Sequence, residues 1–78
     1  MDIKILGTGC VNCNNLEANT RTALADLGLD LEIDKVTDPG EIVGWGVMST
    51  PALVIDDEVV VSGRVPPADQ IKALLASR

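Results

Sequence analysis

The sequence predicts an α/β fold in which a four-stranded mixed sheet is flanked by helices, in the order β-α-β-α-β-β-α. Residues 2–6 read as a short apolar strand, apolar and polar residues alternate over residues 29–36, and a helical repeat separates these two runs. Two further apolar runs, 52–55 and 59–61, are close enough to form an antiparallel hairpin. A strand-helix-strand start implies a parallel pair joined by a right-handed crossover, so the sheet is mixed.

The first half of the chain carries three of these elements. The strand over residues 2–6 leads into the turn Gly7-Thr8-Gly9, and apolar residues at helical spacing then predict a helix over 11–27. Gly28 follows this helix directly, at the position where a left-handed C-terminal cap is expected. The second strand is expected over 29–36, with one mostly apolar face.

A short second helix is expected to begin at Asp38. Asp38 can cap it, Pro39 fits the first helical position, and Glu41 stands three residues after the cap. The helix must end soon, because two glycines flank Trp45. We expect Trp45, the single aromatic residue, to pack in the core or in a cleft.

The second half continues with the hairpin and a last helix. Residues 56–58 join the two hairpin strands in a tight turn. Pro66 and Pro67 then open the final helix. Its apolar stripe consists of Ile71, Leu74 and Leu75.

Length and composition limit the class of protein. The 78 residues suffice for one domain, residues 1–78, which buries roughly 60% of the surface of its unfolded chain. Hydrophobic residues make up 46% of the chain, so it should fold rather than stay disordered. The net charge is −6, the basic residues are scattered, and Phe and Tyr are absent, which argues against a nucleic-acid partner.

The expected cellular compartment depends on whether the chain carries a signal peptide or a membrane-spanning segment. The start of the chain does not read as a signal peptide, and the longest apolar runs are too short to span a bilayer. We therefore expect a cytoplasmic protein that is not membrane-embedded, and a monomer. In a reducing cytosol, a CxxC pair is more often catalytic, redox-active or metal-binding than a permanent crosslink.

Cys10-Val11-Asn12-Cys13 is the motif that carries the chemistry. It contains both cysteines of the chain and lies at the junction between the expected first strand and first helix. A two-residue spacer suits a reversible disulfide or a soft metal ion such as Cu(I) or Zn(II). Both readings remain open on the motif alone.

The redox reading assigns different roles to the two cysteines. At a helix start, unpaired backbone N–H groups carry a partial positive charge, which favours the thiolate of Cys10. Cys13 lies one helical turn later on the same side, where we expect it to be more buried. Cys10 would attack a partner disulfide, and Cys13 would then displace the reduced partner. Val11 and Asn12 are uncharged. They are expected to set the reduction potential of the cysteine pair and to contact the partner.

A second motif, Ser49-Thr50-Pro51, precedes the third strand. Proline cannot donate a hydrogen bond to a sheet, so it belongs at the first residue or the edge of a strand. Only about 5–6% of X-Pro bonds in folded proteins are cis, which by itself favours a trans bond here.

Taken together, these motifs resemble the thioredoxin superfamily. The strand, the G-C-x-x-C opening a helix, the β-α unit, the T-P before a hairpin, the later glycine and the final helix cover nearly the whole chain. The compact length is similar to that of glutaredoxins. The stretch from Gly7 to Cys13 with Gly63-Arg64-Val65 looks most like small redox-active disulfide proteins of archaea and bacteria.

The resemblance implies a thioredoxin-like fold and a protein disulfide oxidoreductase. It implies Cys10 as nucleophile, Cys13 as resolving thiol, and a cis bond between Thr50 and Pro51, both of which would contact the partner. The implied partners are protein disulfides and an upstream reductase. No cofactor or metal is expected beyond the reversible Cys10–Cys13 disulfide.

Two other classes compete with this reading. Small soft-metal chaperones also place a CxxC between a first strand and a first helix, but a hairpin follows that helix directly and the chain ends on a strand. A structural zinc site needs four ligands, and this chain has no histidine and no further cysteine. A non-catalytic interaction module is the third class, and the retained cysteine pair argues against it.

Overall fold

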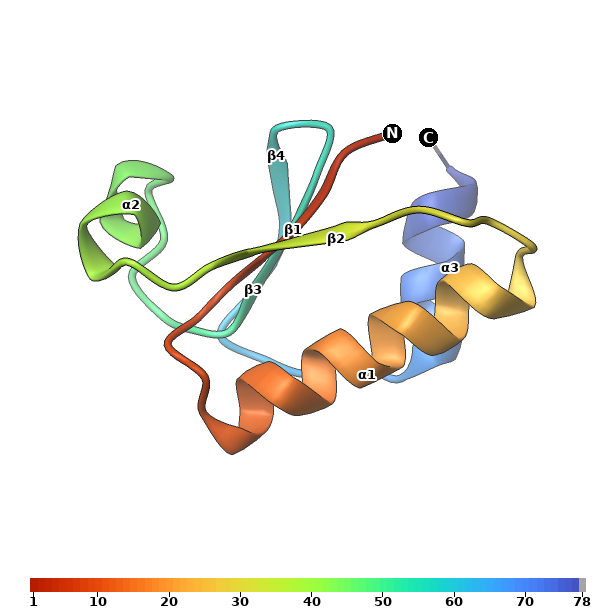
Figure 1. Cartoon of the computed structure of the whole chain (residues 1–78), viewed down its shortest axis with the longest axis horizontal. Coiled ribbons are helices and arrows are strands. Elements are labelled where there is room, and N and C mark those ends of the chain that lie inside the picture. The colour runs from red at the N-terminus through yellow and green to blue at the C-terminus, as the bar shows by residue number, and fades with distance from the viewer. Residues whose placement is uncertain (78) are drawn as a thin grey trace.

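A computed structural model of the chain describes residues 1–77 and gives the element order that the sequence predicts (Figure 1). Arg78, the last residue of the expected single domain, lies outside the described residues. The elements are β1 (Ile3–Leu6), α1 (Val11–Asp26), β2 (Ile33–Val36), α2 (Pro39–Gly44), β3 (Ala52–Ile55), β4 (Glu58–Ser62) and α3 (Ala68–Ala76).

The four strands form one mixed sheet in the order β2-β1-β3-β4. β1 runs parallel to β2 and antiparallel to β3, and β3 pairs antiparallel with β4. β1 is therefore central, and its end lies beside the start of β3, since Leu6 is paired with Ala52. The predicted mixed sheet with a parallel pair and a hairpin is confirmed.

β2 is shorter than the alternation in the sequence predicts. The prediction of a strand over 29–36 is wrong for residues 29–32. Leu29 belongs to the end of α1, where its N–H bonds to the carbonyl of Leu24 at 2.9 Å and the N–H of Gly28 bonds to that of Ala25 at 3.1 Å. These two bonds form a Schellman cap with Gly28 at a φ of +70°. β1 offers a partner only from Ile3 onward, so pairing begins at Ile33.

The short second helix and the hairpin follow their local sequence signals. Asp38 caps α2 by accepting a 3.0 Å hydrogen bond from the N–H of Gly40. Asp56 and Asp57 make the hairpin turn with φ values of 52° and 64°. Aspartate tolerates this left-handed region better than most residues do, which explains the tight turn.

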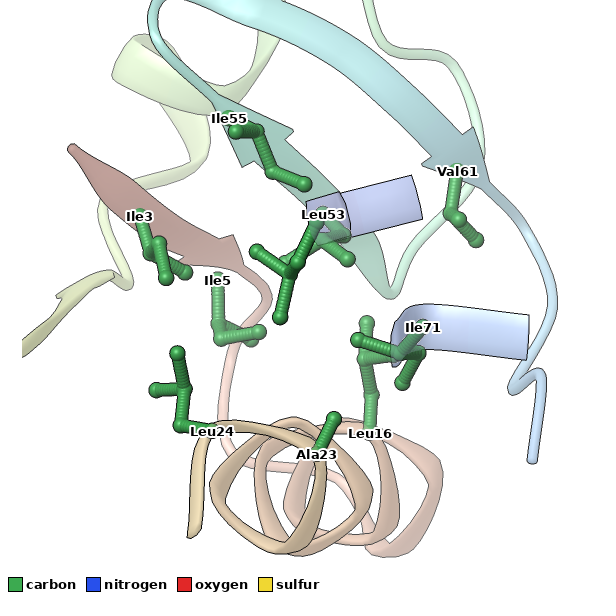
Figure 2. Packing of buried hydrophobic residues seen from close by; sticks show 10 residues of the cluster. Ile3, Ile5, Leu16, Ala23, Leu24, Leu53, Ile55, Val61 and Ile71 are labelled. Atoms are coloured by element: carbon green, nitrogen blue, oxygen red, sulfur yellow. The ribbon is translucent and has the colours of Figure 1, made fainter. Parts of the chain in front are cut away.

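The larger core lies between the sheet and the pair α1 and α3 (Figure 2). α1 and α3 pack beside each other on one face of the sheet, and α2 covers the other face (Figure 1). The buried members of the larger cluster are Ile3, Ile5, Leu16, Ala23, Leu24, Leu53, Ile55, Val61, Ile71 and Leu75. All are aliphatic, as the composition requires.

A smaller cluster fills the space between the sheet and α2. Its buried members are Leu6, Ile42, Val47, Ala52 and Val54. Trp45 is half-buried and packs against this cluster, which confirms its predicted packing role. Lys4 lies on the same side, with its Nζ 5.7 Å from the centre of the Trp45 ring and 3.7 Å from Asp57 Oδ1.

Candidate active site

The turn between β1 and α1 places the two cysteines at one end of the sheet. Gly7 ends the strand with a 2.9 Å hydrogen bond from its N–H to the carbonyl of Val36 on β2. Gly9 then adopts a φ of +89°, in the region that glycine reaches without strain. The chain enters α1 directly afterwards, so Cys10 stands at the helix N-cap.

Cys10 caps α1 with its sulfur. Its Sγ accepts a 3.2 Å hydrogen bond from the N–H of Cys13, and its carbonyl accepts a 3.0 Å bond from the N–H of Asn14. The sulfur therefore occupies the place where a serine or aspartate oxygen usually caps a helix. A backbone donor directed at this sulfur at the start of a helix favours its thiolate over its thiol.

The two cysteines are joined by a disulfide and differ sharply in burial. Their Cα atoms are 5.0 Å apart, within the range of protein disulfides. Cys10 is exposed, whereas Cys13 is only 4% exposed. A partner can therefore reach Cys10 and not Cys13, and the expected difference in burial is confirmed.

Gly7 makes room for the buried sulfur. A Cβ placed on Gly7 would overlap Cys13 Sγ and would lie 3.1 Å from Cys13 Cβ. Any residue other than glycine would therefore push Cys13 away from its position under the start of the helix.

The segment that contains Thr50 and Pro51 reaches the same end of the sheet. Pro51 directly precedes Ala52, which is paired with Leu6 just before the cysteine turn (Figure 1). The Thr50–Pro51 bond is cis, in agreement with the prediction. Pro51 is fully buried, while Thr50 is exposed.

The end of β4 holds this segment in place. The N–H of Gly63 donates a 2.8 Å hydrogen bond to the carbonyl of Pro51, and Ser62 Oγ donates a 3.3 Å bond to the carbonyl of Ser49. Gly63 has a φ of +75°, and a Cβ placed on it would lie 2.9 Å from Ser49 Cβ. The segment before Pro51 thus packs directly against the backbone of Gly63.

The spacer residues and the loop before Ser49 expose apolar surface. Val11 is 75% exposed, Asn12 is exposed, and Met48 is 98% exposed. The two expected contact residues of the spacer are therefore available to a partner. The exposed apolar side chain of Val11, next to Cys10 in the chain, suits brief contact with another protein better than contact with water.

A cleft with a volume of about 130 Å³ adjoins Cys13. Residues of three segments line it: Ile5, Gly7 and Gly9 from β1 and its turn, Cys13, Asn14 and Glu17 from α1, and Lys35 and Thr37 from β2 and beyond. The buried cysteine therefore faces charged side chains as well as the apolar core.

Glu17 is the centre of an ion-pair network in this cleft. Its Oε1 lies 3.1 Å from Lys35 Nζ, and its Oε2 lies 2.9 Å from both Nε and Nη2 of Arg21. Hydrogen bonds from Lys35 and then Arg21 hold the pKa of the Glu17 carboxyl below its ordinary value. Glu17 is thus an anion at neutral pH, held between two cations.

Some functional neighbours escaped the sequence reasoning. It identified no acidic residue near Cys13, yet Glu17 lies on the same face of α1, and the spacing of four residues was the available signal. Gly63 carried no comparable signal, because the atom it makes room for, Ser49 Cβ, comes from another segment. Lys4, the basic residue nearest in sequence to Cys10, faces Trp45 and Asp57 instead.

Residues 1–77 hold neither a cluster of metal ligands nor a helix suited to cross a membrane. Within this described part of the chain, no group of three or more His, Cys, Asp or Glu side chains is arranged to hold a metal ion. None of the described helices combines the length and the apolar character that crossing a membrane requires.

Comparison with known proteins finds related sequences over nearly the whole chain. A family model described as a thioredoxin domain matches residues 1–76. A thioredoxin of Methanothermobacter thermautotrophicus is 41% identical over 76 residues, which cover 97% of this chain and 99% of that protein. A thioredoxin of Methanocaldococcus jannaschii is 45% identical over 75 residues, which cover 96% of this chain and 86% of that protein.

Proposed function

Because this chain belongs to the thioredoxin family, we propose that it reduces protein disulfides, with Cys10 as the attacking thiol and Cys13 as the resolving thiol. Thiol-disulfide exchange as a class of chemistry follows from the family and from the Cys10–Cys13 disulfide. The observation that carries the assignment of roles is the contrast between the exposed Cys10 at the N-cap of α1 and the buried Cys13 one turn later.

The reaction proceeds in two exchanges. The Cys10 thiolate attacks one sulfur of the partner disulfide, the partner's S–S bond breaks, and the leaving thiolate takes a proton. Cys13 then loses its proton and attacks Cys10 Sγ, which releases the second partner sulfur. The partner gains two electrons and two protons as a dithiol, and the protein is left with the Cys10–Cys13 disulfide.

The partner peptide is proposed to lie across the exposed surface that Val11, Asn12 and Thr50 share. Thr50 is exposed, and its neighbour Pro51 is buried and held by Gly63, so the backbone of Thr50 is presented on a fixed support. A preformed support reduces the ordering that binding would otherwise require. Pro51 therefore serves partner contact by holding Thr50.

The protein needs a supply of electrons to act more than once. A dithiol reductase that reopens the Cys10–Cys13 disulfide fits this need, because the disulfide itself is the only redox group the mechanism uses. The relatives named thioredoxin support a protein substrate, and we propose a cytoplasmic setting, where protein disulfides are reduced rather than maintained.

The test is reduction of insulin by dithiothreitol, followed as precipitation of the freed chains. Cys10→Ser should abolish the acceleration over dithiothreitol alone, because no attacking thiolate remains. Cys13→Ser should form mixed disulfides with an oxidised substrate protein that persist on a non-reducing gel, because nothing resolves them. Full multiple-turnover dithiol activity of Cys13→Ser would contradict the assigned roles.

A matched control separates chemistry from folding. Thermal unfolding of each reduced variant, compared with that of the reduced parent, reports directly whether the serine disturbs the fold. Binding of Cu(I) with no insulin reduction by the parent protein would favour a soft-metal carrier instead.

A further inference from the structure

Met48 presents an apolar side chain almost entirely to water. It is 98% exposed, compared with 75% for Val11, the next most exposed large apolar side chain of residues 1–77. A side chain with so little contact contributes almost nothing to the packing of its own domain. The proposed function assigns no role to Met48, and the stability of the fold does not explain its exposure.

Met48 leads directly into the segment on which the partner peptide is proposed to lie. The end of β4 fixes the backbone of that segment, through the 2.8 Å hydrogen bond from the N–H of Gly63 to the carbonyl of Pro51. Two steps along the backbone separate Met48 from Thr50, so their Cα atoms are at most about 7.6 Å apart. The methionine side chain is long and has three rotatable bonds. A peptide that lies on Thr50 is therefore within its reach.

The sulfur of Met48 differs in accessibility from the other sulfur atoms of the protein. The chain has two methionines and two cysteines. In the oxidised protein both cysteines are held in the disulfide, which has no thiolate to react with a peroxide. Met1 is only 46% exposed and precedes β1, whose other end leads into the cysteine turn. Met48 is thus the more accessible thioether and the one next to the partner segment.

We propose that Met48 is a site of oxidation by peroxides and that its sulfoxide weakens the binding of partner proteins. This inference rests on the proposed function, since it concerns the surface on which the partner lies. In the reaction the Met48 sulfur attacks one oxygen of hydrogen peroxide, the O–O bond breaks, and a sulfur–oxygen bond forms. The sulfur gives up two electrons and becomes a sulfoxide, and the peroxide is reduced to water.

The polarity of the sulfoxide gives the modification its effect. An unbranched thioether adapts to many apolar surfaces, which suits brief contact with a partner. The added oxygen makes the end of the side chain polar, so burying it against an apolar surface costs its hydrogen bonds to water. Because Met48 has almost no contact with its own domain, oxidation leaves the fold intact and changes only the contact with the partner. Methionine sulfoxide reductases restore the thioether, so the modification is reversible.

The experiment begins with the oxidised protein, in which the disulfide protects both cysteines. The protein is treated with hydrogen peroxide, and peptide mass spectrometry over time gives the fraction of each methionine that carries an added oxygen. Met48 should be oxidised about two- to threefold faster than Met1, in keeping with its greater exposure. After removal of the peroxide, insulin reduction at saturating dithiothreitol is measured. The KM for insulin should rise about two- to fivefold at constant kcat, because an apolar contact is weakened.

Met48→Leu is the matched control, because leucine is apolar and has no sulfur to oxidise. Whatever KM this variant has before treatment, peroxide should leave that value unchanged, although Met1 can still be oxidised. Met48→Gln places a polar group at the same position and should have a higher KM than Met48→Leu without any treatment. Urea unfolding of the treated parent should match that of the untreated parent, since the oxidised side chain lies outside the packed core.

The outcomes separate this inference from the proposed function. If the untreated parent does not accelerate insulin reduction, the proposed function fails and this inference fails with it. If the parent is active and its KM is unchanged after Met48 has been oxidised, the role of Met48 fails alone. Oxidation of Met48 no faster than that of Met1, an equal rise in KM for peroxide-treated Met48→Leu, or a loss of stability in the treated parent also overturns the inference.

Discussion

The turn before α1 and the segment before β3 lie at the same end of the sheet, and each depends on a glycine. Gly7 makes room for the sulfur of Cys13, and Gly63 makes room for Ser49. In the first turn the glycine and the residue it accommodates belong to one local stretch. In the second, the glycine comes from the far end of β4 and reaches Ser49 only because β3 and β4 pair. One site is thus built locally and the other by the sheet.

The two regions also differ in charge. The first adjoins a cleft that contains Glu17 and Lys35, whereas the residues that form the second, Ser49 to Pro51 with Ser62 and Gly63, carry no ionisable side chain. Reactivity that responds to pH is therefore expected from the first region, and a fixed shape from the second. Substitutions can test each half of this contrast.

The largest expected effect is that of Gly7→Ala in the oxidised protein. The new Cβ would overlap Cys13 Sγ, so Cys13 and the start of α1 must shift, at a cost of about 1–3 kcal/mol in the free energy of unfolding. Urea unfolding of the oxidised protein measures this cost. Gly44→Ala is the matched control, since a Cβ there meets nothing within 4 Å, and it should change stability by less than about 0.5 kcal/mol. Equal midpoints for the two variants would refute the steric role of Gly7.

Gly63→Ala should lower stability by a comparable amount and, in addition, lower activity. It introduces a side chain at a φ of +75° and brings its Cβ to 2.9 Å from Ser49 Cβ. Gly28 has a similar φ of +70°, and a Cβ placed on it would meet no atom within 4 Å. Gly28→Ala therefore measures the backbone strain alone, about 1–2 kcal/mol, without a new contact.

The comparison between these two variants is the informative result. We expect Gly63→Ala to lose insulin reduction through a higher KM, because the Ser49–Pro51 segment moves, while Gly28→Ala keeps the parent KM. Steady-state kinetics at saturating dithiothreitol measure both. If the two variants have the same KM, Gly63 does not position the segment before Pro51.

The smallest expected effect concerns the charges beside the first region. The folded-state pKa of Glu17 is lowered, so its contribution to stability is present above its unfolded pKa and is lost as the pH falls through the folded value. Arg21 and Lys35 are both 56% exposed, so water screens the pairs and the contribution is about 0.5 kcal/mol. Urea unfolding of Glu17→Gln should show this deficit at neutral pH and none in acid.

Glu32→Gln supplies the control for this measurement. It makes the same change of charge outside the cleft, so it should follow the parent protein at every pH. A deficit of Glu17→Gln that persists unchanged in acid would show that lost packing, and not the ion pairs, causes it.

Much of this architecture could be predicted from the sequence because its signals are local. The helix cap at Asp38, the glycine after α1 and the hairpin turn depend on neighbouring residues, and each lies where it was expected. The error at residues 29–32 has the opposite cause. Their alternation is typical of a strand, but a strand exists only where a neighbour pairs with it, and β1 offers none before Ile3.

The sequence by itself located the reactive groups, because Cys10 and Cys13 are separated by two residues at a helix start and this spacing allows them to form a disulfide. It also located Thr50 and Pro51 directly before a strand. Only the tertiary structure decided their surroundings: Gly63 against Ser49, and Lys35 across the cleft on Glu17. These contacts join separate segments, so they depend on how the sheet and α1 pack and not on any local pattern.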